Sequence, residues 1–157
     1  MKFLTKKISQ FKECESNTTP KILLNICDYL RYGITDSNEF YRNRYVEPAK
    51  DFNKLQLAGK IKMGTIFYST PLSYHIIANI VCVELPKTTY NLIPFKLNWF
   101  LRGCERVSKY CIKHDVKEIH TPIFGTDILE GDWGKIYSGM SKIFRDSKTI
   151  DSLIIYV

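Results

Sequence analysis

The chain of 157 residues is 45% hydrophobic and 25% charged, which is typical of one globular domain and argues against wholesale disorder. Its longest apolar run, 76–83, is much shorter than the roughly 20 residues of a membrane helix. The first residues are basic and lack the apolar segment of a signal peptide. The net charge of +7 favours anionic partners such as nucleic acid or phosphorylated small molecules, although a merely solvated basic surface is the commoner explanation. We therefore expect one cytoplasmic domain over 1–157, with no membrane partner.

The first predicted elements are a strand, a turn and two helices. The run 22–27 is apolar and short, as a buried strand is. A turn at Gly33 follows, and Asp36 and Ser37 are candidate caps for the next helix. Gly59 suits the position just past the end of the second helix. The expected helices are 39–44 and 49–58.

Strand and helix patterns alternate through the rest of the chain. Runs rich in β-branched and aromatic residues predict buried strands at 64–69, 74–85, 118–125 and 152–157. Apolar residues at three- and four-residue steps predict one helix over 94–114 and another that begins near Asp132. This alternation predicts an α/β fold, a three-layer α/β/α sandwich with a mixed, mostly parallel sheet of about five to seven strands. The side chains expected to be largely buried are Trp99, Trp133, Phe100, Phe144, Ile136, Ile80 and Ile154.

The five cysteines and three histidines show no metal-binding pattern. The cysteines are odd in number, form no Cys-x-x-Cys pair and lie within apolar runs, as reduced and buried thiols do. The histidines are scattered without the spacing of metal ligands. We therefore expect no metal, no cofactor and no Cys/His nucleophile.

The segment 122–133, PIFGTDILEGDW, is the most informative loop. A strand ends near Phe124, Gly125 and Gly131 bracket the loop, and a helix opens near Asp132. Ligands of α/β sheets bind at the carboxyl ends of strands, where glycines let the backbone approach and free amides favour phosphate. The alternative is an ordinary strand-to-helix turn with Asp132 as its N-cap. The loop is neither a P-loop nor a Gly-x-Gly-x-x-Gly fingerprint, so the residues alone leave both interpretations open.

The frame of Pro122, Gly125, Gly131 and Trp133, followed by a helix and a final strand, resembles the phosphate loop of the macrodomain family of ADP-ribose-binding modules. The closest likeness is to small phage and bacterial members. Upstream, the sequence Leu-Asn-Ile-Cys-Asp ending at Asp28 resembles the family's Val-Asn-x-x-Asn strand end. The resemblance covers 21–157 and is most specific over 118–157. It implies the macrodomain-like sandwich.

The resemblance also implies a function: binding of ADP-ribose or a related nucleotide derivative. An active member would be an ADP-ribosyl hydrolase or an ADP-ribose-phosphate phosphatase. In that case Asn25, Asp28 and Asp127 would position or deprotonate the attacking water. Asn25 is equally suited to cap the neighbouring loop, and Asp28 is equally suited to a turn. The residues expected to contact the ligand are Gly33, Phe124, Gly125, Thr126, Asp127, Ile128, Leu129 and Gly131.

Departures from the family pattern favour an alternative, a catalytically silent module on the same fold that holds nucleotide, nucleic acid or protein. Asp127 replaces the second glycine of the loop and would bring a negative charge towards a diphosphate. Gly33 is the single glycine where the first loop usually has a run, and the strand 80–84 lacks the lysine that one hydrolase branch uses.

The basic face of the predicted helix 94–114 makes nucleic acid a candidate partner. A solvated helix face is the commoner explanation of such a pattern. The residues of this face are Lys96, Arg102, Arg106, Lys109 and Lys113.

Overall fold

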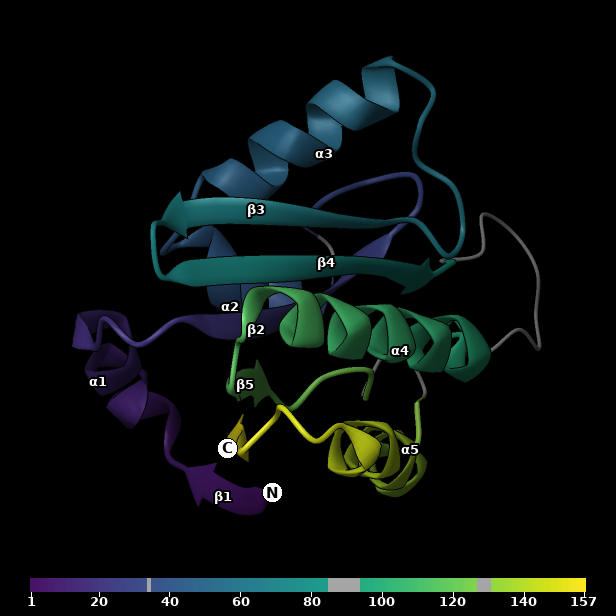
Figure 1. Cartoon of the computed structure of the whole chain (residues 1–157). Coiled ribbons are helices and arrows are strands. Elements are labelled where there is room, and N and C mark those ends of the chain that lie inside the picture. Colours follow the sequence, from purple (N-terminus) through teal and green to yellow (C-terminus); the bar gives the residue numbers. More distant parts are fainter. Residues whose placement is uncertain (34, 85–93, 127–130) are drawn as a thin grey trace.

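A computed structural model describes residues 1–33, 35–84, 94–126 and 131–157 (Figure 1). The elements in chain order are β1 (Lys2–Lys6), the 3-10 helix η1 (Ile8–Gln10), α1 (Phe11–Ser16), β2 (Lys21–Asp28), α2 (Asp36–Arg42), α3 (Glu47–Leu57), β3 (Ile66–Leu72), β4 (His75–Val83), α4 (Leu97–His114), β5 (Glu118–Pro122), α5 (Trp133–Asp146) and β6 (Ser152–Tyr156). The strands form one sheet in the order β1-β6-β5-β2-β4-β3, in which only the β3–β4 pairing is antiparallel.

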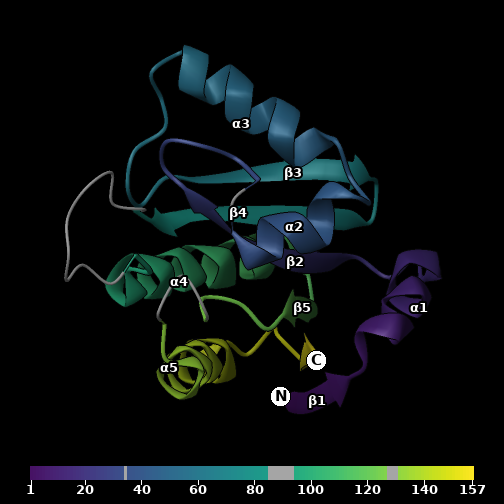
Figure 2. The same cartoon turned by 180° about the vertical axis from the view of Figure 1, so that it is seen from behind.

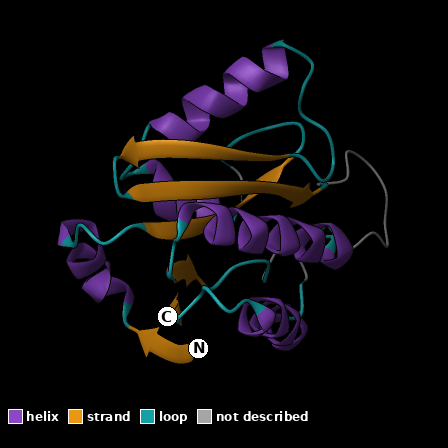
Figure 3. Cartoon of the chain, viewed as in Figure 1, coloured by secondary structure: helices purple, strands orange, loops and turns teal. Residues whose placement is uncertain are grey.

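Helices cover both faces of this sheet. Figure 1 shows α4 and α5 on one face, and Figure 2, seen from behind, shows α1, α2 and α3 on the other. Figure 3 separates the strand layer from the two helical layers by colour. The fold is therefore the three-layer α/β/α sandwich with a mixed, mostly parallel sheet that the sequence predicts.

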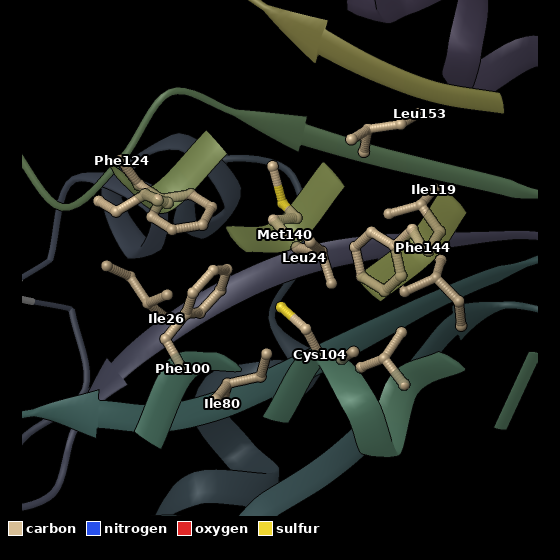
Figure 4. Packing of buried hydrophobic residues seen from close by; sticks show 14 of the residues in the cluster. Leu24, Ile26, Ile80, Phe100, Cys104, Ile119, Phe124, Met140, Phe144 and Leu153 are labelled. Carbon is tan, nitrogen blue, oxygen red and sulfur yellow. The ribbon is translucent and has the colours of Figure 1, made fainter. Parts of the chain in front are cut away.

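The central strand β2 is buried along its whole length because both of its faces carry packed side chains. Leu24 and Ile26 point towards α4 and α5, where Figure 4 shows them among Phe100, Met140 and Phe144. The alternate residues face α1, α2 and α3, as expected for a strand whose side chains alternate between faces. One of those alternate residues is Asn25, so β2 brings a polar group into the layer next to α2.

Five of the seven side chains expected in the core are buried, and Trp99 is the clear exception. Its indole is 37% exposed because it lies over the backbone of Gly64, near the start of α4, outside the main core. Trp133 is half-buried against Phe124 and Tyr137. The prediction of burial is therefore wrong for Trp99 and only partly right for Trp133.

Several element ends differ from the sequence prediction. The helix α2 begins at Asp36, three residues earlier than expected, because the Thr35 side chain caps it by accepting from the Asn38 N–H. The strand β5 ends at Pro122. Asp132 caps α5, as the turn interpretation of this loop expects, and Gly59 follows α3 with a φ of 68°, as predicted.

Candidate functional site

The carboxyl ends of the parallel strands β2 and β5 lie at the same edge of the sheet, and the loops that follow them meet there. The loop after β2 leads into α2, and the loop after β5 leads towards α5. Asp36, the first residue of α2, connects the two segments, because its Oδ2 accepts a hydrogen bond from the Gly125 N–H at 2.9 Å. The sequence predicts Asp36 only as a candidate helix cap. The cap of α2 is Thr35, and Asp36 contacts the loop after β5 instead.

The Asp36 carboxylate is held by backbone amides of α2 and of the loop after β5. Its Oδ1 accepts from the Ser37 N–H at 2.9 Å, and the Thr126 backbone also hydrogen-bonds to the carboxyl group. Burial raises the pKa of Asp36 from 3.8 to about 6, although the hydrogen bonds from these backbone amides act in the opposite direction. The side chain thus titrates close to neutral pH at the point where the loops meet.

This pKa makes the stability of the protein depend on pH in a definite direction. The folded state binds the Asp36 proton more tightly than the unfolded chain does, so protonated Asp36 favours folding. This contribution to the free energy of unfolding is lost as the pH rises from about 4 through about 6. We expect Asp36→Asn to gain stability relative to the parent protein over this range, measured by urea unfolding at several pH values. Asp146→Asn, at an exposed position, is the matched control and should show no such trend. The opposite trend for Asp36→Asn would contradict the assignment.

Asn25 is fully buried, and other side chains use both ends of its amide. Its Nδ2 donates to Asn79 Oδ1 at 2.8 Å and to the Tyr32 hydroxyl at 3.2 Å. Its Oδ1 accepts from Ser37 Oγ and from Asn38 Nδ2, both at 2.8 Å. Because these partners belong to β4, the first loop and α2, Asn25 docks α2 and the loop on the sheet. This geometry supports the loop-capping interpretation.

Asp28 and Gly33 shape the first loop. The Asp28 carboxylate, 1% exposed, accepts from the N–H groups of Leu30 at 2.8 Å and Arg31 at 3.1 Å, which closes the turn after β2. Gly33 has a φ of 95°, a left-handed conformation that favours glycine, and its N–H donates to Asn38 Oδ1 at 3.1 Å. The Gly33 N–H is thus paired with a side chain of α2.

The loop after β5 is described at its two ends. Phe124 is fully buried between Phe100 and Trp133, so its side chain belongs to the core and leaves only its backbone to the loop. Gly125 has a φ of 75°, and Gly131 packs against its carbonyl group. Three of the residues expected to contact a ligand, Asp127, Ile128 and Leu129, lie outside the described residues.

The close approach of Gly131 to Gly125 predicts intolerance of a side chain. A Cβ at Gly131 would overlap the carbonyl oxygen of Gly125, which is backbone and cannot rotate away. We expect Gly131→Ala to lower the free energy of unfolding by about 1–3 kcal/mol, the usual cost of overpacking, in urea denaturation. Gly134→Ala, in the first turn of α5, is the control and should be neutral or stabilising because alanine favours helix. Equal stability of the two variants would contradict a tight loop.

The cysteines and the other candidate metal ligands of the described residues show no reactive or metal-binding arrangement. All five cysteines are free and buried, and burial raises the pKa of each thiol, so little reactive thiolate exists at neutral pH. Among the described residues, no group of three or more His, Cys, Asp or Glu side chains could hold a metal ion. No helix in the described part of the chain is long and apolar enough to cross a membrane.

A cavity of about 730 Å³ opens at the opposite edge, where β2, β5 and β6 begin. Lys21, Glu118 and His120 are among the side chains that line it, so its charges are of both signs. Of the residues predicted for the ligand site, those that the structure describes do not line this cavity.

The class of fold follows from its layers, strand order and paired loops: it is the macrodomain fold. A macrodomain protein from Streptomyces coelicolor matches it with a TM-score of 0.76 and 14% identity over 99% of both chains. The macrodomain of Thermus aquaticus DarG matches with a TM-score of 0.73 and 12% identity over 99% of this chain and 97% of that one. A Bacteroides thetaiotaomicron protein of unknown function matches with a TM-score of 0.84 and 16% identity over 99% and 98% of the two chains. At these identities the matches confirm the predicted resemblance at the level of the fold.

No family profile matches the sequence, and no curated protein does.

Proposed function

We propose that the chain binds ADP-ribose or a related nucleotide derivative where the loop after β2 meets the loop after β5. Macrodomains are ADP-ribose-binding modules, and the fold supports this function at that general level. The observation that carries the proposal is the hydrogen bond from the Gly125 N–H to Asp36. It shows that amides of the glycine-bracketed loop converge on an anionic group.

The Asp36 carboxylate thus stands where a ligand's phosphate would find donors. Two amides of the loop, those of Gly125 and Thr126, contact this carboxylate. A charged carboxylate beside a diphosphate is unfavourable, whereas a protonated one is not. Since the pKa of Asp36 is about 6, we expect ADP-ribose to bind more tightly at pH 5.5 than at pH 7.5.

Calorimetry tests the proposal with ADP-ribose, AMP and NAD as ligands. We expect ADP-ribose to bind more tightly than AMP, which lacks the second phosphate and the distal ribose. Asp36→Asn should bind ADP-ribose at pH 7.5 more tightly than the parent protein and should lose most of the pH dependence. Asp146→Asn should behave as the parent protein does. No heat with ADP-ribose at either pH would overturn the proposal.

Hydrolysis of an ADP-ribosyl ester or of ADP-ribose phosphate is the second candidate function. The observation that favours it is again Asp36, because a general base works best when its pKa lies near the working pH. In this role Asp36 accepts a proton from the attacking water. Asn25 and Asp28 hold the loop, in keeping with their internal hydrogen bonds.

Release of ADP-ribose or of phosphate from these two substrates is the test of catalysis. We expect the rate of hydrolysis to rise with pH through about 6. In Asp36→Asn the rate should fall at least about 100-fold, although the variant still binds ADP-ribose. If the parent protein binds ADP-ribose but consumes neither substrate, the chain is the catalytically silent module.

A further inference from the structure

A second surface, far from the two loops in sequence, lies between β3 and α4. Two hollows of about 460 and 290 Å³ share Ile66 and Arg106 in their linings, so they lie next to each other along the same surface. Figure 1 shows α4 running alongside β4, with β3 as the next strand. We call this surface the β3–α4 groove. It begins at Gly64 and Trp99, and it ends at Tyr110 and Lys113.

The charges that line the β3–α4 groove are all positive. Its four cations are exposed, and no carboxylate of a described residue lies within 4.0 Å of any of them. Among the described residues, no Asp or Glu lines either hollow, and Glu105, the single acidic residue of α4, lies outside both linings. The four cations are Lys62, Arg106, Lys109 and Lys113. Arg106 is also fixed in place, because its Nη1 donates to the Gly64 carbonyl oxygen at 3.2 Å.

Aromatic rings lie at both ends of the same groove. At one end the indole of Trp99 is 37% exposed, and the Arg102 guanidinium lies 5.2 Å from its ring centre. At the other end Tyr68 and Tyr110 stack with ring centres 4.2 Å apart, and the exposed His114 extends this stack at a further 4.2 Å. Tyr68 and Tyr110 are partly buried and pack against the main core, whereas Trp99 and His114 are exposed and can meet a ligand.

From this combination we propose that the β3–α4 groove binds single-stranded nucleic acid. Unpaired cations attract phosphates, and exposed rings stack on bases, which a single strand presents and a duplex hides. The stretch of α4 from Arg102 to Lys113 is about 16 Å long, which equals about five nucleotides at a stacked spacing of 3.4 Å. The proposal does not depend on ADP-ribose binding, because it uses none of the residues of the two loops.

Fluorescence anisotropy with a labelled twelve-residue oligothymidylate measures this binding at different salt concentrations. Four phosphate contacts on a single strand predict a slope of log K against log salt of about −2.8, or a loss of about 50-fold in affinity between 50 and 200 mM salt. The double variant Lys109→Gln/Lys113→Gln removes two contacts and should reduce the slope to about −1.4. The matched control is Lys50→Gln/Lys54→Gln, which removes the same charge from exposed positions of α3 and should keep the parent slope.

The rings are tested separately from the charges. Trp99→Leu should weaken oligothymidylate binding at least about fivefold and leave the salt slope unchanged, because stacking involves no counterion. His114→Ala is a second variant at an exposed position, where loss of folding is not a concern, and it should act in the same direction. Thermal unfolding followed by circular dichroism checks that each variant is folded.

Two further probes decide between this partner and general attraction of anions. A duplex of the same length and polyglutamate of matched charge should each bind at least about tenfold more weakly than oligothymidylate at 50 mM salt. Binding of either the duplex or polyglutamate as tightly as oligothymidylate would overturn the proposal, and so would an equal loss of affinity in the two lysine double variants. Saturating ADP-ribose should leave the affinity for oligothymidylate unchanged.

Discussion

Replacement of Asn25 by alanine is expected to destabilise the protein by about 3 kcal/mol or more. Asn25 is fully buried, and its amide hydrogen-bonds to five described side chains, those of Tyr32, Ser37, Asn38 and Asn79 and, more weakly, the Cys27 Sγ atom. Each buried polar group that loses its partner costs about 1–3 kcal/mol. Asn79 and Asn38 would each lose one such partner. Urea denaturation at constant pH measures this loss, and Asn53→Ala, at an exposed position of α3, is the control with an expected change near zero.

The pairing of Asn25 with Asn79 makes this prediction sharper. The two residues face each other in the register of β2 and β4, and their side chains meet at 2.8 Å. The double variant Asn25→Ala/Asn79→Ala should therefore lose less stability than the sum of the two single losses, since one shared hydrogen bond is counted twice. Additive losses, or a loss below about 0.5 kcal/mol for Asn25→Ala, would show that this network does not hold α2 on the sheet.

The strands and helices that sequence analysis predicted share a strong periodic pattern. β2 and β4 are apolar runs because both of their faces are buried, and α4 keeps one apolar side over eighteen residues. β1 was not predicted because it is an edge strand with mostly exposed residues, so it shows no apolar run. α1 was missed for a related reason. It has six residues and buries only Phe11 and Cys14, too few for a helical period.

The site was harder to predict than the fold because its contacts join distant parts of the chain. Asn25 meets Asn79 across 54 positions, and Asp36 meets Gly125 across 89. A local pattern shows that Asp36 suits a helix start, but only the packing of α2 against the loop after β5 reveals its second role. In the same way, the sequence offered the amides of Gly33 and Gly125 as donors for a ligand, and the structure shows partners within the chain for both.

Replacement of Asp127 by glycine is expected to tighten ADP-ribose binding at least tenfold. Asp127 stands where the family pattern has the second glycine of the phosphate loop. Two unit charges about 4 Å apart repel by about 4 kcal/mol at an effective dielectric constant near 20, which corresponds to several powers of ten in affinity. Because part of this repulsion is screened, we expect a gain in affinity of at least tenfold when a side chain directed at the diphosphate is removed. Calorimetry with ADP-ribose at pH 7.5 measures it.

Two further variants separate the possible causes of such a gain. Asp127→Asn removes the charge and keeps the side chain, so it should give most of the gain if repulsion is the cause. A gain confined to Asp127→Gly would instead identify the backbone freedom of glycine as the cause. Asp146→Asn removes an equal charge at an exposed position of α5 and should leave the affinity unchanged. Unchanged affinity in Asp127→Gly itself would mean that the side chain faces away from the ligand, and lost hydrolysis with intact binding would make Asp127 a catalytic residue.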